Sequence, residues 1–164
     1  MGSKKRVAVP QQSGKKSVSF PKTPEGNQTI ILRFDMLDRD GAFAFDLLRP
    51  DFDHKEVLDK LIVYSNMTWA EVMRQVHDRA GKSKHHFLSG SGLSHEAIER
   101  IRAKKLEEYS DSIFSFALQN RLRIIGVRTG VEFHVVWYDP EHQFCPSRAC
   151  LKIGDVSSSE GFWA

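Results

Sequence analysis

Four side chains suited to acid-base or electrostatic chemistry fall close together in the last third of the chain, at Arg123, His134, Tyr138 and His142. In RNA cleavage, a base takes the proton of the 2′-hydroxyl, guanidinium groups stabilise the charge that develops on phosphorus, and an acid protonates the leaving oxygen. That route needs no metal ion. We therefore predict that these four residues form a metal-independent catalytic group.

A second group of polar residues is expected to bind the RNA backbone. Most of it lies in the segment 82–92, which is rich in glycine and polar residues and is predicted to be a loop. Loops carry binding groups more often than core elements do, and this one is long enough to fold over the catalytic group. A plain exposed loop is the alternative interpretation. The predicted RNA-binding residues are Arg121, Lys82, Lys84, His85 and His86.

Three consecutive β-strands are predicted to carry the catalytic group. Alternation of apolar and other residues indicates strands at about 114–118, 122–128 and 131–138. The first two are expected to be joined by the three residues 119–121. The last two are expected to be joined by Thr129-Gly130, because glycine adopts a positive φ at little cost in a two-residue hairpin loop.

The second loop sets the predicted register, in which Arg128 faces Val131 and all other pairs follow. One face of the sheet is then expected to pack on the core, and the other is expected to be open and to hold the catalytic group. The alternative is that helices cover this second face too. The predicted core face contains Phe114, Phe116, Leu118, Leu122, Ile124, Phe133, Val135 and Trp137. The predicted open face contains Arg121, Arg123, Ile125, Val127, Glu132, His134, Val136 and Tyr138.

One strand and three helices are predicted upstream of these strands. Their expected bounds are 29–37 for the strand and 53–64, 68–81 and 94–109 for the helices. Asp53 and Ser94 are suited to cap the first and third helices, and Thr68 with Glu71 has the spacing of a capping box. The first helix is expected to bury a single stripe, formed by Val57, Leu58, Leu61 and Ile62. The sequence thus predicts the α+β class, with an N-terminal strand, two to three helices and a three-stranded antiparallel meander.

Charge and composition divide the chain into tails and one domain. With 164 residues, of which 40% are hydrophobic, the chain has room for one domain with a core. Residues 1–28 contain six basic residues and one acidic residue, a net charge of +5, and the remainder carries −2. A nucleic-acid site in the body must therefore be local. We predict a flexible basic tail at 1–28, a single α+β domain at 29–153 and a flexible tail at 154–164.

Two cysteines do not make a disulfide scaffold in a chain of this size, and this favours a cytoplasmic location. His142, Cys145 and Cys150 have the side chains of a zinc site, yet no fourth ligand is evident, so no metal or other cofactor is predicted. No apolar run approaches the roughly 18 residues that span a bilayer, and no membrane association is expected. The absence of Walker, Rossmann, nucleophile-elbow and zincin motifs argues against those enzyme classes.

Two motifs near the end, WYDPEH at 137–142 and CPS at 145–147, are similar to those of a widespread group of short bacterial and phage proteins. With the Thr68-Trp69 helix and the histidine pair at 85–86, this resemblance covers about residues 30–147. It implies a single domain and names no activity.

The order of elements resembles the RelE and ParE toxin fold, whose RNA-cleaving members use basic residues, His and Tyr on an open sheet face. The resemblance implies a toxin of a toxin-antitoxin pair that cleaves mRNA in or near the ribosome and has an antitoxin protein as its partner. It also implies an active surface formed by Arg121, Arg123, His134 and Tyr138. The inserted loop and third helix, and a less basic body, depart from that family.

Two further interpretations remain open. The first is a non-enzymatic phage or bacterial interaction module that binds a protein partner through its sheet edge or its basic tail. The second rests on Arg79 and His85, which match the loose Arg-x4–6-His spacing of the all-helical HEPN ribonucleases. That spacing falls in a predicted loop of a sheet-rich chain, which disfavours it.

Overall fold

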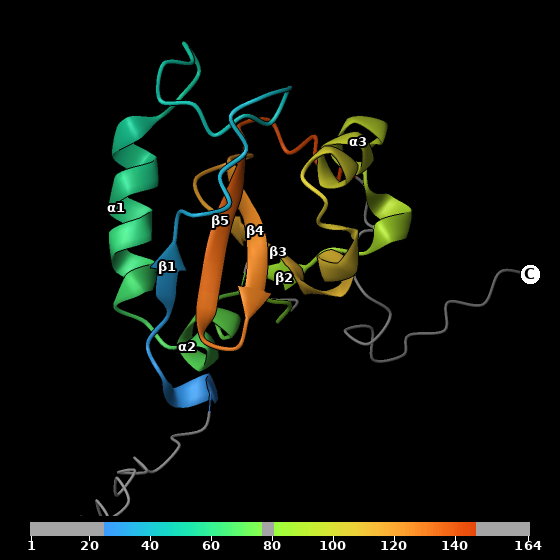
Figure 1. The fold of residues 1–164 in the computed structure, drawn as a ribbon. Coiled ribbons are helices and arrows are strands. Elements are labelled where there is room, and N and C mark those ends of the chain that lie inside the picture. The colour runs from blue at the N-terminus through green and yellow to red at the C-terminus, as the bar shows by residue number, and fades with distance from the viewer. Residues whose placement is uncertain (1–24, 77–80, 147–164) are drawn as a thin grey trace, which may run out of the picture.

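The computed structural model describes residues 25–76 and 81–146 of the chain. Five strands form one mixed sheet in the order β1-β5-β4-β3-β2. Helices α1 and α2 lie on one face of this sheet and α3 lies on the other, so the sheet is the middle layer of three (Figure 1). The predicted α+β class is confirmed. The open sheet face is not found, because packed residues cover both faces.

The two edge strands are short. β1 (Ile31–Arg33) runs parallel to β5 (Glu132–Asp139), and β2 (His86–Phe87) runs antiparallel to β3 (Ile113–Ala117). The sequence predicts a longer first strand, over 29–37, and a loop where β2 lies. A strand of two residues is too short to show the alternation on which such predictions depend.

The hairpin between β3 and β4 (Arg123–Thr129) has the predicted three-residue connection. The backbone N–H of Leu118 donates to the carbonyl of Leu122 at 3.0 Å, and Asn120 in the loop has a φ of 52°. Asparagine is among the few residues that adopt this conformation readily. The predicted inward side of β3 is therefore confirmed.

The hairpin between β4 and β5 has a different register from the predicted one. Thr129 pairs with Glu132, so the two-residue loop is Gly130-Val131, with a φ of 60° at Gly130. The prediction paired Arg128 with Val131, which is wrong by two residues along the partner strand. The glycine was recognised as the turn residue, but it is the first residue of the loop and not the second.

A β-bulge interrupts the same pair of strands. Gly126 pairs with Val135 and Ile125 with Trp137, which leaves Val136 as the extra residue. A Cβ atom at Gly126 would collide with a backbone carbonyl oxygen of β5, so the close approach at the bulge requires glycine. The predicted alternation along β5 therefore fails beyond the bulge.

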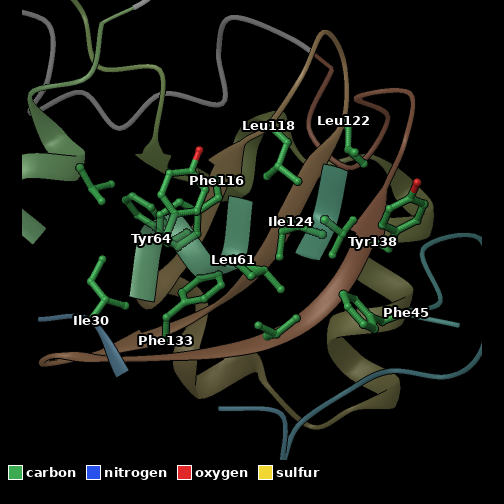
Figure 2. Packing of buried hydrophobic residues seen from close by; sticks show 14 of the residues in the cluster. Ile30, Phe45, Leu61, Tyr64, Phe116, Leu118, Leu122, Ile124, Phe133 and Tyr138 are labelled. Atoms are coloured by element: carbon green, nitrogen blue, oxygen red, sulfur yellow. The ribbon is translucent and has the colours of Figure 1, made fainter. Parts of the chain in front are cut away.

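The bulge moves two aromatic residues to faces opposite to those predicted. Trp137 packs on the α3 side of the sheet. Tyr138 packs on the α1 side (Figure 2). Their neighbours show that each face has a core of its own. The α1 side includes Leu61, Tyr64, Trp69, Phe114, Phe116, Leu118, Leu122, Ile124 and Phe133. The α3 side includes Phe43, Ala97, Ile101, Leu106, Ile113, Ile125, Val127, Val136 and Phe144.

Helix α1 (His54–Ser65) is capped as predicted, since the carboxylate of Asp53 accepts a hydrogen bond from the backbone of residue 56 at 2.9 Å. Its buried residues are Val57, Leu61 and Tyr64. Leu58 and Ile62, which the sequence predicts to be buried with them, are exposed. The apolar surface of α1 is therefore wider than the sheet can cover.

Helices α2 (Trp69–Met73) and α3 (His95–Ala103) start where predicted and end earlier. The capping box of Thr68 and Glu71 is present at the start of α2. After α3, Lys105 has a φ of 56°, which ends the helix well before residue 109. In the described part of the chain, three short 3-10 helices complete the secondary structure, η1 (Glu25–Asn27), η2 (Gly90–Gly92) and η3 (Glu107–Ser112).

The predicted tails lie almost wholly outside the described residues. Of residues 1–28 only the last four are described, and η1 among them contacts α2. Within the described ranges, no helix is both long and apolar enough to cross a membrane.

Candidate functional site

The predicted catalytic residues are not brought together. Arg123 pairs with Asp139, and His134 pairs with Val127. Because Val127 is four residues after Arg123 in β4, Arg123 and His134 are separated by about 13 Å along the strands, at ~3.3 Å per residue. Arg123 and His134 are buried, with 7% and 8% exposure. Arg123 and His134 thus occupy two separate buried positions and do not share an open face.

His134 is bonded on both of its ring nitrogens. Its Nδ1 lies 2.8 Å from a carboxylate oxygen of Asp35, and its Nε2 lies 3.3 Å from the hydroxyl of Thr129. Asp35 follows β1 and Thr129 is the last residue of β4, and these two strands flank β5 in the sheet. These bonds give the imidazole a structural role as an anchor for the chain after β1.

Tyr138 is equally engaged, on the other face. Its hydroxyl donates to the carbonyl of Asp51 at 2.7 Å and accepts from the backbone N–H of Asp53 at 3.0 Å. The ring stacks on Phe52, and burial raises the pKa of the phenol. The hydroxyl fixes the chain that leads into α1, so it is not displayed to a substrate.

The predicted RNA-binding residues also separate. His85 is fully buried: its Nδ1 accepts the backbone N–H of Ala117 at 3.0 Å, and its Nε2 lies 2.9 Å from the side-chain oxygen of Gln75. His86 is in β2 and half-buried. Lys82 and Arg121 are exposed and Lys84 is half-buried. His85 is therefore a packing residue, whereas Lys82 and Arg121 are exposed and Lys84 and His86 are partly exposed.

The corner after β5 is organised by Asp139. This buried carboxylate accepts the backbone N–H groups of Gln143 and Phe144, at 2.9 and 2.8 Å. Burial raises the pKa of Asp139, although these two donors favour the charged form. His142, half-buried in the same corner, has a φ of 58°. The WYDPEH motif is thus a capped corner, which is the structural role that Asp-Pro predicts.

Two pockets of about 300 and 400 Å³ adjoin this corner and share Asp51, Pro140 and Glu141 in their linings. The smaller pocket brings Arg121 and Tyr138 together, as predicted. Carboxylates outnumber cations in both linings, however, and a negative potential repels phosphate. The acidic residues are Asp51, Asp53, Glu56 and Glu141 in the first pocket and Asp51, Glu96, Asp139 and Glu141 in the second.

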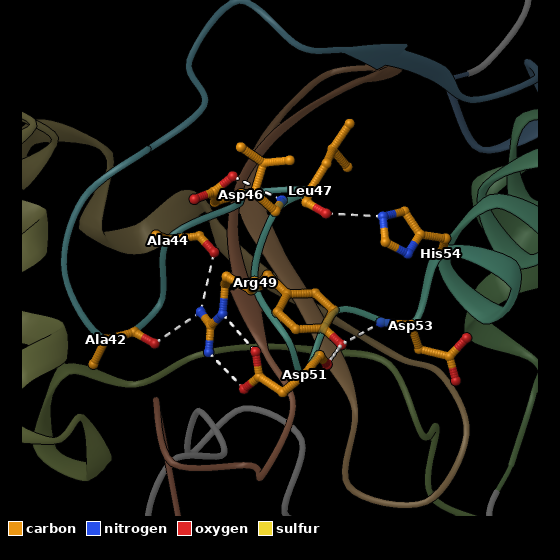
Figure 3. Close-up of polar contacts among 10 residues, drawn as sticks. Ala42, Ala44, Asp46, Leu47, Arg49, Asp51, Asp53 and His54 are labelled. Carbon is orange, nitrogen blue, oxygen red and sulfur yellow. Dashed lines mark hydrogen bonds and ion pairs between the residues drawn. The ribbon is translucent and has the colours of Figure 1, made fainter.

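The segment before α1 is held by a polar network that sequence reasoning did not identify (Figure 3). Arg49 binds the carboxylate of Asp51 through two hydrogen bonds of 2.8 Å, and it also donates to the carbonyls of Ala42 and Ala44 at 3.0 Å. These bonds hold the pKa of Asp51 below its ordinary value. Residues 42–53 therefore form a fixed wall beside α1.

This wall, α1 and the segment that follows β1 line an apolar groove with a volume of about 440 Å³, here called the α1 groove. Its lining is formed by Phe34, Leu37, Arg39, Phe45, Leu47, Phe52, His54, Val57, Leu58 and Leu61. The Nε2 of His54 lies 2.9 Å from the carbonyl of Leu47 and joins the two sides (Figure 3). The groove is therefore preformed by hydrogen bonds and does not depend on an occupant.

Exposed large hydrophobic residues are concentrated in the part of the sequence that forms the groove. Of the eight large hydrophobic residues that are exposed in the described part of the chain, seven lie between residues 31 and 63. They include Leu58, which is 60% exposed, and Leu48, which is 90% exposed. Three of these seven residues, Phe34, Leu47 and Leu58, line the α1 groove, and an exposed apolar groove is typical of an interaction site. The seven residues are Ile31, Phe34, Leu47, Leu48, Leu58, Ile62 and Val63.

The segment that builds the groove is acidic. Residues 31–62 contain eight acidic and five basic residues, a net charge of −3. The sequence contained a signal for this groove, because the apolar residues of α1 cover a wider surface than one buried stripe needs. Val57 and Leu61 face the core, and Leu58 lies on the neighbouring face. The wall opposite α1 gave no periodic signal, because it is a loop.

The zinc interpretation is not supported by the described residues. They contain no group of three or more His, Cys, Asp or Glu side chains placed to hold a metal ion. Cys145 is buried and disulfide-bonded, and Cys150 lies outside the described residues. Arg79, on which the HEPN interpretation depends, also lies outside them.

Comparison of the chain with protein-family models, with curated proteins and with solved structures finds no match.

Proposed function

We propose that the protein is an interaction module without catalytic activity, which binds an amphipathic, basic segment of a partner protein in the α1 groove. The observation that carries this proposal is the groove itself, with Leu58 and Leu47 exposed on its two sides. Burial of such side chains is the main favourable term in helix-in-groove recognition.

The size of the apolar surface favours a protein segment over a small molecule. The groove has the volume of a ligand pocket, but Ile62 of α1 and Leu48, which follows Leu47 of the lining, are also exposed. Ile62 lies one turn after Leu58 on the same face of α1, so an occupant that follows the helix contacts both. A partner helix with apolar residues at i, i+4 and i+7 fits that spacing.

The charge of the groove segment favours a basic partner. A net charge of −3 over residues 31–62 attracts lysine and arginine residues at the edges of the docked segment. The polar network around Arg49 contributes indirectly, because a wall that is fixed before binding loses little conformational entropy when the partner docks.

The test is selection of binding sequences from a displayed library of random peptides, with the full-length chain as bait. We expect enrichment of peptides that combine apolar residues at helical spacing with lysine or arginine. The Leu58→Gln variant should bind these peptides about tenfold more weakly, since loss of one buried leucine contact costs about 1.5 kcal/mol or more. The matched control is Val76→Gln, which changes an exposed apolar residue outside the groove.

Two results would refute the proposal. One is enrichment of peptides without an apolar pattern. The other is equal affinity of the Leu58→Gln and Val76→Gln variants for the selected peptides.

A RelE-like RNA-cleaving toxin is the second candidate. Its support is the resemblance of the element order to the RelE and ParE fold and the position of Arg121 and Tyr138 in one pocket. The acidic lining of that pocket is a disadvantage for phosphate binding. Expression of the wild-type chain and of Arg121→Ala in bacteria tests this function. Growth arrest and RNA cleavage by the wild type, with loss of both in the variant, are the expected results.

A further inference from the structure

Three polar side chains are linked by hydrogen bonds at the end of the β4–β5 hairpin. The Nδ1 of His134 lies 2.8 Å from a carboxylate oxygen of Asp35, and its Nε2 lies 3.3 Å from the hydroxyl of Thr129. A hydroxyl, an imidazole and a carboxylate in this order activate the hydroxyl as a nucleophile on several unrelated folds. The hairpin end thus contains the parts of an activated nucleophile.

The strand register explains why these three residues meet. His134 lies two residues after the partner of Thr129 in β5, so the two side chains are diagonal neighbours on one face of the sheet. Asp35 lies two residues after the end of β1, which pairs with β5 on its other side. The ring of His134 therefore has the hydroxyl on one side and the carboxylate on the other.

The hydrogen bonds decide which ring nitrogen of His134 carries the proton. A carboxylate can only accept, so Nδ1 donates to Asp35. This bond holds the pKa of Asp35 below its ordinary value, which keeps the carboxylate charged. In the neutral ring Nε2 is then the acceptor, and the hydroxyl of Thr129 donates to it. The imidazole is therefore oriented to take the proton of this hydroxyl.

The hydroxyl is accessible and the ring is held. Thr129 is exposed, whereas His134 is only 8% exposed. A reagent in solution can reach the hydroxyl, and packing restricts the imidazole to the orientation that its two hydrogen bonds require. Both conditions favour attack by Thr129 on a bound or colliding molecule.

Charges around the hydroxyl favour an uncharged reagent. Glu132 lies 3.5 Å from the Nε2 of His134, and the other oxygen of Glu132 accepts from the Nε of Arg33 at 3.0 Å. Asp35 adds a second carboxylate on the other side of the ring. Two carboxylates and one guanidinium leave a net negative charge, which repels phosphoryl groups and tolerates a neutral acyl group.

We propose that Thr129 is a site of covalent acylation, at which its hydroxyl attacks the carbonyl carbon of a neutral activated ester and His134 acts as the base. The bond from the Oγ of Thr129 to the carbonyl carbon forms while the hydroxyl proton passes to the Nε2 of His134. The bond from that carbon to the leaving oxygen then breaks, and this oxygen takes the proton from Nε2. Asp35 is a positioning residue, because it acts on the imidazole and not on the ester.

This modification goes beyond the proposed docking function. None of Asp35, Thr129 and His134 lines the α1 groove. A single acyl transfer to the protein itself is also not turnover, so it is consistent with a module that has no catalytic activity.

The experiment is incubation of the full-length chain with p-nitrophenyl acetate at about pH 8, where histidine side chains of ordinary pKa are neutral. Peptide mapping by fragmentation mass spectrometry measures the rate of acetylation at each hydroxyl. The internal control is Ser110, an exposed residue of η3. We expect acetylation of Thr129 to be at least about 100-fold faster than that of Ser110, as general base catalysis provides.

Asp35→Asn tests the positioning role while it leaves the hydroxyl and the base in place. The side chain of Asp35 is 61% exposed, so this variant keeps the fold, which its urea midpoint checks. Acetylation of Thr129 should fall at least about tenfold in Asp35→Asn. Asp35→Glu, which keeps a carboxylate, should recover part of the rate. The control is Asp59→Asn, which changes an exposed carboxylate on α1 and should react like the wild type.

The proposal fails if Thr129 is acetylated no faster than Ser110 in the wild type. It also fails if Asp35→Asn reacts as fast as Asp59→Asn, or if Asp35→Glu reacts as slowly as Asp35→Asn.

Discussion

Arg100 of α3 binds the buried carboxylate of Asp38 through two hydrogen bonds, from Nε to Oδ2 at 2.8 Å and from Nη2 to Oδ1 at 2.7 Å. The same carboxylate accepts the indole N–H of Trp137 at 2.9 Å and the backbone N–H of Asp40 at 3.1 Å. The segment after β1, helix α3 and strand β5 are thus joined at one side chain. This junction holds α3 against the sheet and closes the face that the sequence predicts to be open.

Replacement of Asp38 by asparagine should destabilise the protein by about 3 kcal/mol, because it leaves the charge of Arg100 without its partner. Chemical denaturation with urea measures this cost. The control is Asp59→Asn, which breaks the exposed ion pair with Lys55 and should cost about 0.5 kcal/mol or less. Equal losses in the two variants would show that the junction does not contribute to stability.

The stability of the fold should also fall with acidification through Asp38. Burial alone would raise the pKa of Asp38, but its hydrogen bonds and the charge of Arg100 hold the pKa below the ordinary value of 3.8. A carboxyl group whose pKa is lower in the folded state stabilises the fold above its unfolded pKa and loses this effect as the pH falls through its folded pKa. Urea midpoints between about pH 6 and pH 2 should therefore fall more steeply for the wild type than for Asp38→Asn. Parallel curves would contradict the assignment.

Local patterns in the sequence predicted local structure. The caps at Asp53, Thr68 and Ser94 were found because a capping side chain and its backbone partner are only two or three residues apart. The three-residue connection after β3 was found by matching the inward sides of two strands. Long-range features were missed: parallel pairing of β1 with β5 joins residues about a hundred positions apart, and a three-residue strand has no period of its own.

The predicted faces of β5 are wrong beyond Val135 for a specific reason, which is the bulge at Val136. Period-2 counting assumes that no residue is added to a strand, so one extra residue reversed the faces assigned to Trp137 and Tyr138. Gly126 was the available signal, because an isolated glycine inside a strand indicates a bulge or a close backbone approach. Coverage of the second face by helices was the alternative interpretation, and α3 with the segment after β1 provides it.

Substitution of Gly126 by alanine should destabilise the protein by at least about 3 kcal/mol, because the added Cβ collides with the carbonyl oxygen of His134. The matched control is Gly90→Ala, since a Cβ at Gly90 has no neighbour within 4 Å. Thermal unfolding of both variants provides the comparison. If Gly126→Ala unfolds at the temperature of Gly90→Ala, the close approach at the bulge is not as described.

His85 should stabilise the fold through the hydrogen bonds of its two ring nitrogens. His85→Ala removes the acceptor for Ala117, the bond to Gln75 and the ring contacts with Tyr64 and Phe116, and should cost about 3 kcal/mol. In His85→Asn, the amide oxygen replaces Nδ1 as an acceptor and part of the stability should remain. Hydrogen exchange at the Ala117 amide separates these effects, with protection expected in His85→Asn and loss of protection in His85→Ala. Equal exchange in both variants would exclude this bond as a stabilising contact.

Leu58 and Leu61 provide a matched pair on one helix, because the first lines the α1 groove from an exposed position and the second is 6% exposed. Leu61→Ala should destabilise the fold by about 2 to 5 kcal/mol, as expected for a truncated core leucine. Leu58→Ala should change stability by no more than about 0.5 kcal/mol, because its side chain is largely in water in the unbound protein. Urea denaturation of the unbound chain gives both values. A large loss of stability in Leu58→Ala would mean that this leucine serves the core, and the α1 groove would then have no exposed contact on its helical side for a partner to bury.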